Sequence, residues 1–418
     1  MSMLDPTLRS TRGLMRRAAL TISAALAFMG GAAWAQTEIT FWHSMDSATE
    51  TVDALVEAFH ASQDEVRVDA RMIGAYSEAN TRLLAAFGGP DEPVLFQAEI
   101  GFLPRLVAEG ATQPLTDLVD ALPETLVNDF VPGLWAYGEF AGERHGLPWN
   151  SSTPVMYWNV DALRRAGIEP PTTWAEFEAA ADALTSRQAQ GVVFVGDSWL
   201  FEMMVLSRNG RLTDERGVPT LDSPEALAAL TLLDELERRG SLAFFGANET
   251  TPAILGFVRT RSLVAFASIA NWPDIRRFSV AFDMTAGPVP MEPGGAVPLG
   301  GAQLVVMTNA TPAEREAAFQ FWEFLMEPEN LATWVEGSYY IPVRQSVVPL
   351  LDAFYAEVPG RGAALVQLDA AIPRPRIPEF EAMRGILDDM MEKVLRGRMT
   401  PEEALAEAQA RALAEVAR

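Results

Sequence analysis

Short apolar runs alternate with amphipathic helical patterns along most of the chain. Six runs are rich in Val, Ile, Leu and Phe and have the length of buried strands, at residues 39–43, 66–73, 94–98, 192–196, 263–268 and 303–308. After the first run, Val52, Leu55, Val56 and Phe59 recur with the spacing of one helix face. Alternating strands and helices predict an α/β fold with largely parallel sheets.

Four helix starts carry the same local signal, a hydroxyl side chain followed three residues later by Glu. The hydroxyl can accept a hydrogen bond from a free N–H of the first turn, while the Glu reaches back to the capping residue. The pairs are Ser47 with Glu50, Thr173 with Glu176, Thr311 with Glu314 and Thr400 with Glu403. Each pair predicts that a helix begins directly after its hydroxyl residue.

The alternation extends over more residues than one hydrophobic core usually holds, so we expect two α/β lobes. No long Gly/Ser linker separates the halves, which indicates a chain that crosses between the lobes more than once. We expect lobe 1 to comprise residues 36–150 and about 288–342. Lobe 2 would then comprise about 151–287 and about 343–418.

The first 35 residues have the composition of a secretory signal peptide. A basic segment with four arginines precedes the apolar residues 18–29, and residues 33–35 read Ala-Trp-Ala, a small-x-small cleavage pattern. The alternative is a membrane anchor, but the apolar run is shorter than the roughly 20 residues that a span needs. We expect cleavage near Ala35 and export to the periplasm. The Arg16-Arg17 pair leaves open whether export follows the general secretory or the twin-arginine route.

The charge and the composition exclude several classes of function. Lys and Arg number 32 and Asp and Glu number 56, which gives a net charge of −24. Nucleic acids and anionic membranes select basic surfaces, so we expect neither as a partner. The chain has no cysteine, which excludes disulfides, thiol catalysis and cysteine-ligated metal sites.

Catalytic and cofactor motifs are missing from the sequence. The three histidines, at positions 43, 60 and 145, have no metal-type spacing. There is no G-x-S-x-G elbow, no phosphate-binding P-loop and no G-x-G-x-x-G after a strand. We therefore expect no catalytic residue, no metal and no cofactor, and we favour a binding protein over an enzyme.

Five segments, spread over the chain, carry a resemblance to a known family. They are residues 37–45 (TEITFWHSM), 147–161 (LPWNSSTPVMYWNVD), 170–184 (PPTTWAEFEAAADAL), 319–334 (FQFWEFLMEPENLATW) and 339–344 (YYIPVR). The chain resembles the extracellular solute-binding proteins (family 1) of ABC importers, and specifically the branch for sn-glycerol-3-phosphate and glycerophosphodiesters such as glycerophosphocholine. The resemblance implies a clamshell of two α/β lobes that holds its ligand between them. It also implies a permease and an ATPase as partners, and we expect a monomer.

The resemblance implies a phosphate end and a glycerol end in the ligand site. It places an anion-binding arginine at Arg384, whose planar guanidinium fits a phosphate. An i, i+4 ion pair with Asp388 is the ordinary alternative. Tyr76 and Glu99 match the positions that hold the glycerol, and Glu99 follows a predicted strand, where ligands of open α/β sheets bind.

Further positions match ligand contacts of the family. They are Trp199, Ser268, Gly300, Gly301 and Tyr340. Ser151 and Ser152, at the expected first crossover, carry small hydroxyls that could bond a phosphate or hydroxyl group of a ligand, or they could only shape a turn before Pro154. The two glycines would let backbone N–H groups approach an anion closely, although a tight turn explains them equally well. Trp199 could stack on glycerol carbons or on a choline cation, or pack in the core. A second tryptophan that the family has three residues earlier is Gly196 here, and Trp272 could compensate for it.

Two other functions remain open at this level. A receptor for a neutral sugar or oligosaccharide would use Trp42, Trp199 and Trp272 as stacking surfaces. A secreted phosphodiesterase would need carboxylates and a metal, and the sequence shows no set of ligands for one.

Overall fold

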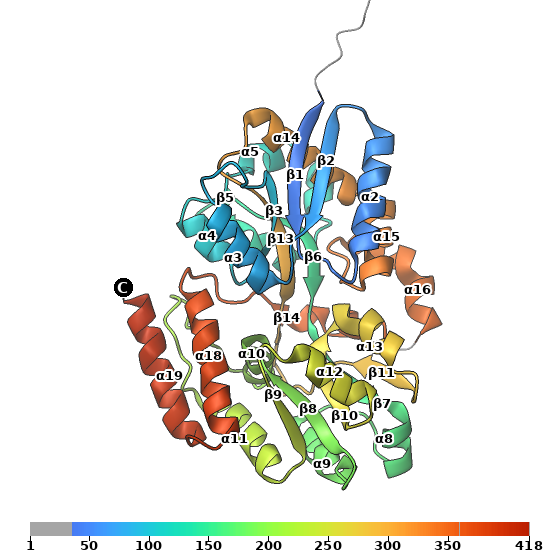
Figure 1. Ribbon diagram of the computed structural model, residues 1–418, viewed down its shortest axis with the longest axis vertical. Coiled ribbons are helices and arrows are strands. Elements are labelled where there is room, and N and C mark those ends of the chain that lie inside the picture. The colour runs from blue at the N-terminus through green and yellow to red at the C-terminus, as the bar shows by residue number, and fades with distance from the viewer. Residues whose placement is uncertain (1–35, 359, 418) are drawn as a thin grey trace, which may run out of the picture.

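The computed structural model describes residues 36–358 and 360–417 and has two lobes (Figure 1). The upper lobe in Figure 1 is built on a five-stranded sheet. In spatial order its strands are β2 (Val66–Met72), β1 (Thr37–His43), β3 (Leu95–Glu99), β13 (Gly300–Val306) and β6 (Leu147–Ser152). The lower lobe has a second five-stranded sheet, with the order β11 (Met284–Gly287), β7 (Pro154–Asn159), β10 (Ser262–Ser268), β8 (Gln190–Gly196) and β9 (Leu242–Gly246). The predicted two-lobed α/β fold is confirmed.

Both sheets are mixed, yet four of the five strands of each run in one direction, so the prediction of largely parallel sheets holds apart from one reversed strand in each, β13 and β7. In the first sheet β1 is parallel to β2 and β3, whereas β13 is antiparallel to β3 and β6. In the second, β8 is parallel to β10 and β9, whereas β7 is antiparallel to β10 and β11. Each reversed strand lies next to a crossing between the lobes. The strand β7 follows β6 directly, and β13 is the strand with which the chain returns to the first sheet. Hydrophobic runs alone do not reveal such returns.

Helices cover the faces of both sheets. Those of the first lobe are α2 (Thr49–Ser62), α3 (Tyr76–Ala86), α4 (Leu103–Ala108), α5 (Thr116–Asp120), α6 (Glu124–Val127), α7 (Pro132–Tyr137), α14 (Pro312–Leu325), α15 (Pro328–Ser338), η2 (Gln345–Leu351) and α16 (Asp352–Glu357). Those on the side of the second sheet are α8 (Val160–Ala166), α9 (Trp174–Leu184), α10 (Ser198–Leu206), α11 (Pro224–Arg238), α12 (Thr250–Val258), η1 (Ile269–Asn271), α13 (Trp272–Phe278), α17 (Ala363–Val366), η3 (Leu368–Ala370), α18 (Phe380–Leu395) and α19 (Pro401–Val416).

Two short ladders complete the described secondary structure. The strands β4 (Glu139–Phe140) and β5 (Glu143–Arg144) form a small hairpin. The strands β12 (Val297–Pro298) and β14 (Ala371–Ile372) pair in parallel where two crossing segments run between the lobes (Figure 1).

Three of the four predicted helix starts are confirmed as capping boxes. They begin α9, α14 and α19, with Thr173, Thr311 and Thr400 as the capping residues. The fourth is wrong, because α2 follows Ala48 and has no side-chain cap. The Ser47 hydroxyl instead donates to Asp274 Oδ2 at 2.7 Å, in α13 of the other lobe. A contact between the lobes thus replaces the local bond.

Each lobe has its own core, and we propose lobe boundaries from the two clusters of buried side chains. The first cluster takes residues between 39 and 149 and between 299 and 351, and the second takes most of its residues from 155–297 and 363–412. The described chain therefore passes between the cores three times. Relative to the expected boundaries, residues 288–298 move to the second lobe, because Val289 and Val297 pack there. Residues 343–351 move to the first lobe, because Val343 and Val347 pack there.

The predicted signal peptide, residues 1–35, lies outside the described residues. Within the part that the structure describes, no helix has the length and apolarity that a membrane crossing requires.

Candidate ligand-binding site

The strand ends of the first sheet bring five predicted site residues to one edge. Glu99 is the last residue of β3, the two serines end β6, and the two glycines begin β13, which lies between β3 and β6. The register sets Glu99 opposite Ala302, Ser151 opposite Gly301, and Ser152 opposite Gly300. Because β6 leads directly into β7, this edge faces the second lobe (Figure 1).

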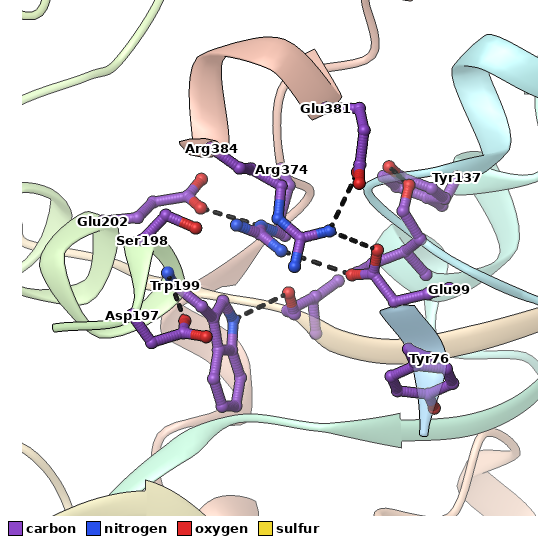
Figure 2. A network of polar contacts seen from close by, with 12 residues as sticks. Tyr76, Glu99, Tyr137, Asp197, Ser198, Trp199, Glu202, Arg374, Glu381 and Arg384 are labelled. Atoms are coloured by element: carbon purple, nitrogen blue, oxygen red, sulfur yellow. Dashed lines mark hydrogen bonds and ion pairs between the residues drawn. The ribbon is translucent and has the colours of Figure 1, made fainter. Parts of the chain in front are cut away.

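A chain of alternating charges crosses from this edge to the second lobe. Figure 2 shows two guanidinium groups around the buried carboxylate of Glu99. Arg384 Nη1 donates to Glu99 Oε2 at 2.8 Å, and Arg374 Nη1 donates to Glu99 Oε1 at 3.3 Å. Arg374 Nε also donates to Glu202 Oε2, in α10, at 2.8 Å. One carboxylate from each lobe is therefore held by the same buried arginine.

Arg384 lies in α18 with part of its side chain accessible. It forms ion pairs with Glu99 and, at 3.2 Å, with Glu381 one turn earlier in the helix. The negative charge of Glu99 raises the pKa of Arg384 above its ordinary value. Arg384 Nε is buried and finds no hydrogen-bond partner among the described residues. That N–H therefore makes no hydrogen bond in this structure and is shielded from solvent.

Asp388 takes a different partner from the one considered in the sequence. Its Oδ1 accepts a hydrogen bond from the backbone N–H of Ser198 at 2.7 Å, whereas the ion pairs of Arg384 go to Glu99 and Glu381. Burial, reinforced by the nearby charge of Asp197, raises the pKa of Asp388 to about 7. The carboxyl of Asp388, which lies in α18 against the first turn of α10, therefore titrates near neutral pH.

We expect the contribution of Asp388 to stability to fall as the pH rises from about 4 to about 7, because Asp388 binds its proton more tightly in the folded chain than in the unfolded one. Asp388→Asn keeps the acceptor for Ser198 and removes this titration. Urea unfolding should then show the variant gaining more stability over the parent at pH 8 than at pH 5.

Asp389→Asn is the matched control for this titration. The hydrogen bond and charge of Lys393 lower the pKa of Asp389, so its contribution is already complete above pH 5. Its loss should shift stability equally at pH 5 and pH 8. An equal gain at both pH values in Asp388→Asn would contradict the titration.

Trp199 reaches from the second lobe to the first. Asp197 caps α10 by accepting from the Trp199 N–H at 2.7 Å, and the indole Nε1 donates to the Leu299 carbonyl at 3.2 Å. The ring lies against Gly300, where a Cβ atom would stand 2.5 Å from Cζ2 of the indole and 2.9 Å from the Ser152 hydroxyl. The missing side chain at Gly300 thus admits the tryptophan. Trp199 remains partly exposed.

The position of the family's second tryptophan is occupied by a residue from another strand. A Cβ on Gly196 would stand 2.7 Å from the ring of Phe244, in β9. Phe244 is in turn covered by the guanidinium of Arg396, 5.0 Å from its ring centroid. Any larger residue at 196 would have to displace Phe244.

Tyr76 and Tyr340 come together on the side of the first lobe. Tyr76 Oη accepts from Asn150 Nδ2 at 3.0 Å, and Gln97 holds Asn150 from behind through a 2.9 Å bond to its Oδ1. Burial raises the pKa of both phenols, and the neighbouring Tyr340 raises that of Tyr76 further. Tyr340 also stacks on Trp334 with its ring centroid 5.8 Å away. Both hydroxyls therefore stay protonated.

Ser151 and Ser268 are engaged in local structure. The Ser151 carbonyl accepts from the N–H of Ile341 at 2.7 Å, which holds the Tyr340 segment against β6. Ser268 Oγ accepts from the N–H of Ala270 at 3.2 Å, so it caps η1. The hydrogen bonds of Ser268 thus involve neither Glu99 nor the two arginines.

Reasoning from the sequence missed Arg374 and Glu202. Arg374 stands between two prolines in a segment without periodicity, and Glu202 is the one charged residue in the apolar helix α10. They are 2% and 1% exposed. A lone charge in an apolar helix was the available signal, since such groups are rarely buried without a partner.

Trp272 does not offer a stacking surface to a ligand. It is 1% exposed, lies in the core of the second lobe and stacks on Tyr339 with ring centroids 6.4 Å apart. The suggestion that it compensates for Gly196 is therefore wrong. Within residues 36–358 and 360–417, no group of three or more His, Asp or Glu side chains converges as metal ligands would.

Comparisons with known proteins agree with this architecture. Residues 54–363 match the bacterial extracellular solute-binding protein family. The sn-glycerol-3-phosphate-binding periplasmic protein UgpB of Escherichia coli K12 is 28% identical over 414 residues, which cover 93% of this chain and 94% of that protein. The UgpB protein of Yersinia enterocolitica is also 28% identical, over 94% of each chain.

Two solved structures share the fold. UgpB of Mycobacterium tuberculosis in complex with glycerophosphocholine has a TM-score of 0.83 at 22% identity, over 92% of this chain and 99% of that one. The GacH receptor of Streptomyces glaucescens, solved unliganded and with acarbose, has a TM-score of 0.82 at 23% identity, over 91% and 99%. With the family match over most of its length, the chain belongs to the bacterial extracellular solute-binding proteins, which capture small molecules for the permease and ATPase subunits of ABC importers.

Proposed function

We propose that this chain is the periplasmic receptor of an importer for sn-glycerol-3-phosphate and glycerophosphodiesters such as glycerophosphocholine, and that it binds them without chemical change. The observation that carries the proposal is the ion pair between Arg384, in the second lobe, and Glu99, at the edge of the first lobe's sheet. The UgpB relatives, whose names state binding of sn-glycerol-3-phosphate, support the choice of ligand. The export signal expected in residues 1–35 would deliver the chain to that compartment.

In the proposed complex the ligand separates the pair between Arg384 and Glu99. The phosphate takes the guanidinium, including the unpartnered Nε, and makes charge-assisted hydrogen bonds with it. The Glu99 oxygen that this exchange frees accepts from the glycerol hydroxyls. A partly exposed Trp199 covers the carbon atoms or a choline group, as a cation–π contact allows.

Other donors complete the proposed site. The hydroxyls of Ser152, Tyr76 and Tyr340 can donate to ligand oxygens, and both phenols stay protonated in their buried setting. A net charge of −24 opposes an anion at long range. Screening at physiological salt limits that repulsion to about 8–10 Å, so the local donors decide binding.

Titration calorimetry tests the proposal directly. The chain without residues 1–35 should bind glycerophosphocholine and sn-glycerol-3-phosphate, and should bind maltose far more weakly. A matching rise in thermal stability should accompany each ligand that binds, because ligand binding to the folded state stabilises it.

A receptor for a neutral sugar is the second candidate. It is favoured by the fold shared with the acarbose-binding GacH receptor and by the exposed part of the Trp199 ring. Maltose binding without binding of either phosphorylated compound would replace the proposed function with this one.

A further inference from the structure

Arg374 occupies an unusual place between the lobes. It lies in the segment that links β14 to α18, and its side chain is 2% exposed. Its guanidinium lies 4.8 Å from the ring centroid of Phe380. It is bonded to Glu99 of the first lobe and to Glu202 of the second (Figure 2). Arg374 therefore contacts both halves of the molecule while being closed to solvent.

Each of the two arginines bonds a different oxygen of the Glu99 carboxylate. Arg374, whose side chain is buried, bonds Oε1. Arg384, whose side chain is 23% exposed, bonds Oε2. An anion that enters from solvent can reach Arg384, whereas Arg374 is covered. When the anion takes Arg384, Glu99 loses one of its two cations and keeps the other.

We propose that Arg374 is a positioning residue for ligand binding that acts through Glu99. The inference rests on the proposed function, since it assigns the hydroxyl-binding carboxylate a buried support. Arg374 keeps Oε1 fixed, so Oε2 stays in place for a glycerol hydroxyl after Arg384 has turned to the phosphate. Without Arg374, the freed carboxylate would be buried with no cation, which is strongly unfavourable.

Glu202 completes this support from the second lobe. Burial raises the pKa of Glu202 and the charge of Arg374 opposes that shift, so the two groups depend on each other. Glu202 lies one helical turn after Ser198 and Trp199 in α10. The helix that carries the stacking tryptophan is thereby tied to the carboxylate that would hold the glycerol.

The test uses the double substitution E202Q/R374M, which removes the pair without leaving a buried charge alone. Calorimetry compares glycerophosphocholine with phosphocholine, which keeps the choline, lacks the glycerol hydroxyls and carries a phosphate monoester in place of the diester. We expect affinity for glycerophosphocholine to fall about tenfold, the effect of one charge-assisted hydrogen bond. Affinity for phosphocholine should fall by at least as much, because its phosphate also draws Arg384 from Glu99 and it supplies no hydroxyl to the freed carboxylate. No loss for either ligand, or a loss confined to glycerophosphocholine, would overturn the proposal.

A second measurement covers the case in which phosphocholine binds too weakly to compare. In a Glu99→Gln background, adding E202Q/R374M should leave the glycerophosphocholine affinity unchanged within about twofold, because effects that act through one residue are not additive. A full tenfold loss in that background would refute action through Glu99. If the parent chain binds none of the phosphorylated glycerols, this proposal falls together with the proposed function. A parent that binds them normally while both tests fail refutes the role of Arg374 alone.

Discussion

Replacing Arg384 with alanine is expected to weaken glycerophosphocholine binding by about 10- to 150-fold. The loss corresponds to charge-assisted hydrogen bonds worth roughly 1.5–3 kcal/mol. The affinity of Arg384→Lys should lie between those of the parent and of Arg384→Ala, because an ammonium keeps the charge but lacks the planar fork of donors that matches a phosphate. Calorimetry with the folded variants measures both losses.

The fold should tolerate Arg384→Ala, since Glu99 keeps its bond to Arg374. Arg411→Ala is the matched control, because Arg411 lies in α19 and pairs with Asp389 and Glu407. We expect its ligand affinity to equal that of the parent. Unchanged binding in Arg384→Ala, or an equal loss for a neutral sugar, would remove the phosphate role from Arg384.

Gly301→Ala is expected to lower the free energy of unfolding by roughly 2–5 kcal/mol, as the sum of backbone strain and overpacking. Gly301 has φ +104°, and a Cβ there would stand 2.1 Å from the Asn150 carbonyl oxygen of the neighbouring strand β6. That oxygen belongs to the backbone of a buried strand and cannot move aside cheaply. Urea unfolding of parent and variant measures the difference.

Gly110→Ala separates strain from the close contact. Gly110 has φ +66°, and a Cβ there would meet nothing within 4 Å. Its substitution should cost about 1 kcal/mol, the penalty for a left-handed backbone alone. A loss in Gly301→Ala no larger than this would mean that the strand accommodates the extra carbon.

Local signals in the sequence predicted the helices and strands well. The Thr173, Thr311 and Thr400 capping boxes need no residue beyond four positions away, and all three form. The Ser47 signal has the same local pattern, yet its hydroxyl bonds to Asp274, which is 227 residues distant. The antiparallel placing of β13 and β7 likewise depends on where the chain crosses between the lobes.

The candidate site was predictable where the resemblance covers a motif. It supplied Glu99 and Arg384, which the structure joins by a 2.8 Å bond. It did not supply Arg374 and Glu202, whose partners are separated from them by more than 170 positions in the sequence. It also gave no account of Gly196, because the ring that fills the adjoining space comes from Phe244 in a different strand. Charge pairing and space filling between distant segments carry no local pattern.

A crystal structure with glycerophosphocholine would show which side chains bind each part of the ligand. The ligand should lie between the lobes, with its phosphate on the guanidinium of Arg384, its glycerol hydroxyls on Glu99 and its choline beside Trp199. Glu99 should still be bonded to Arg374 in that complex. A ligand bound away from Arg384, with the Arg384–Glu99 pair intact, would show that these two residues do not form the binding site.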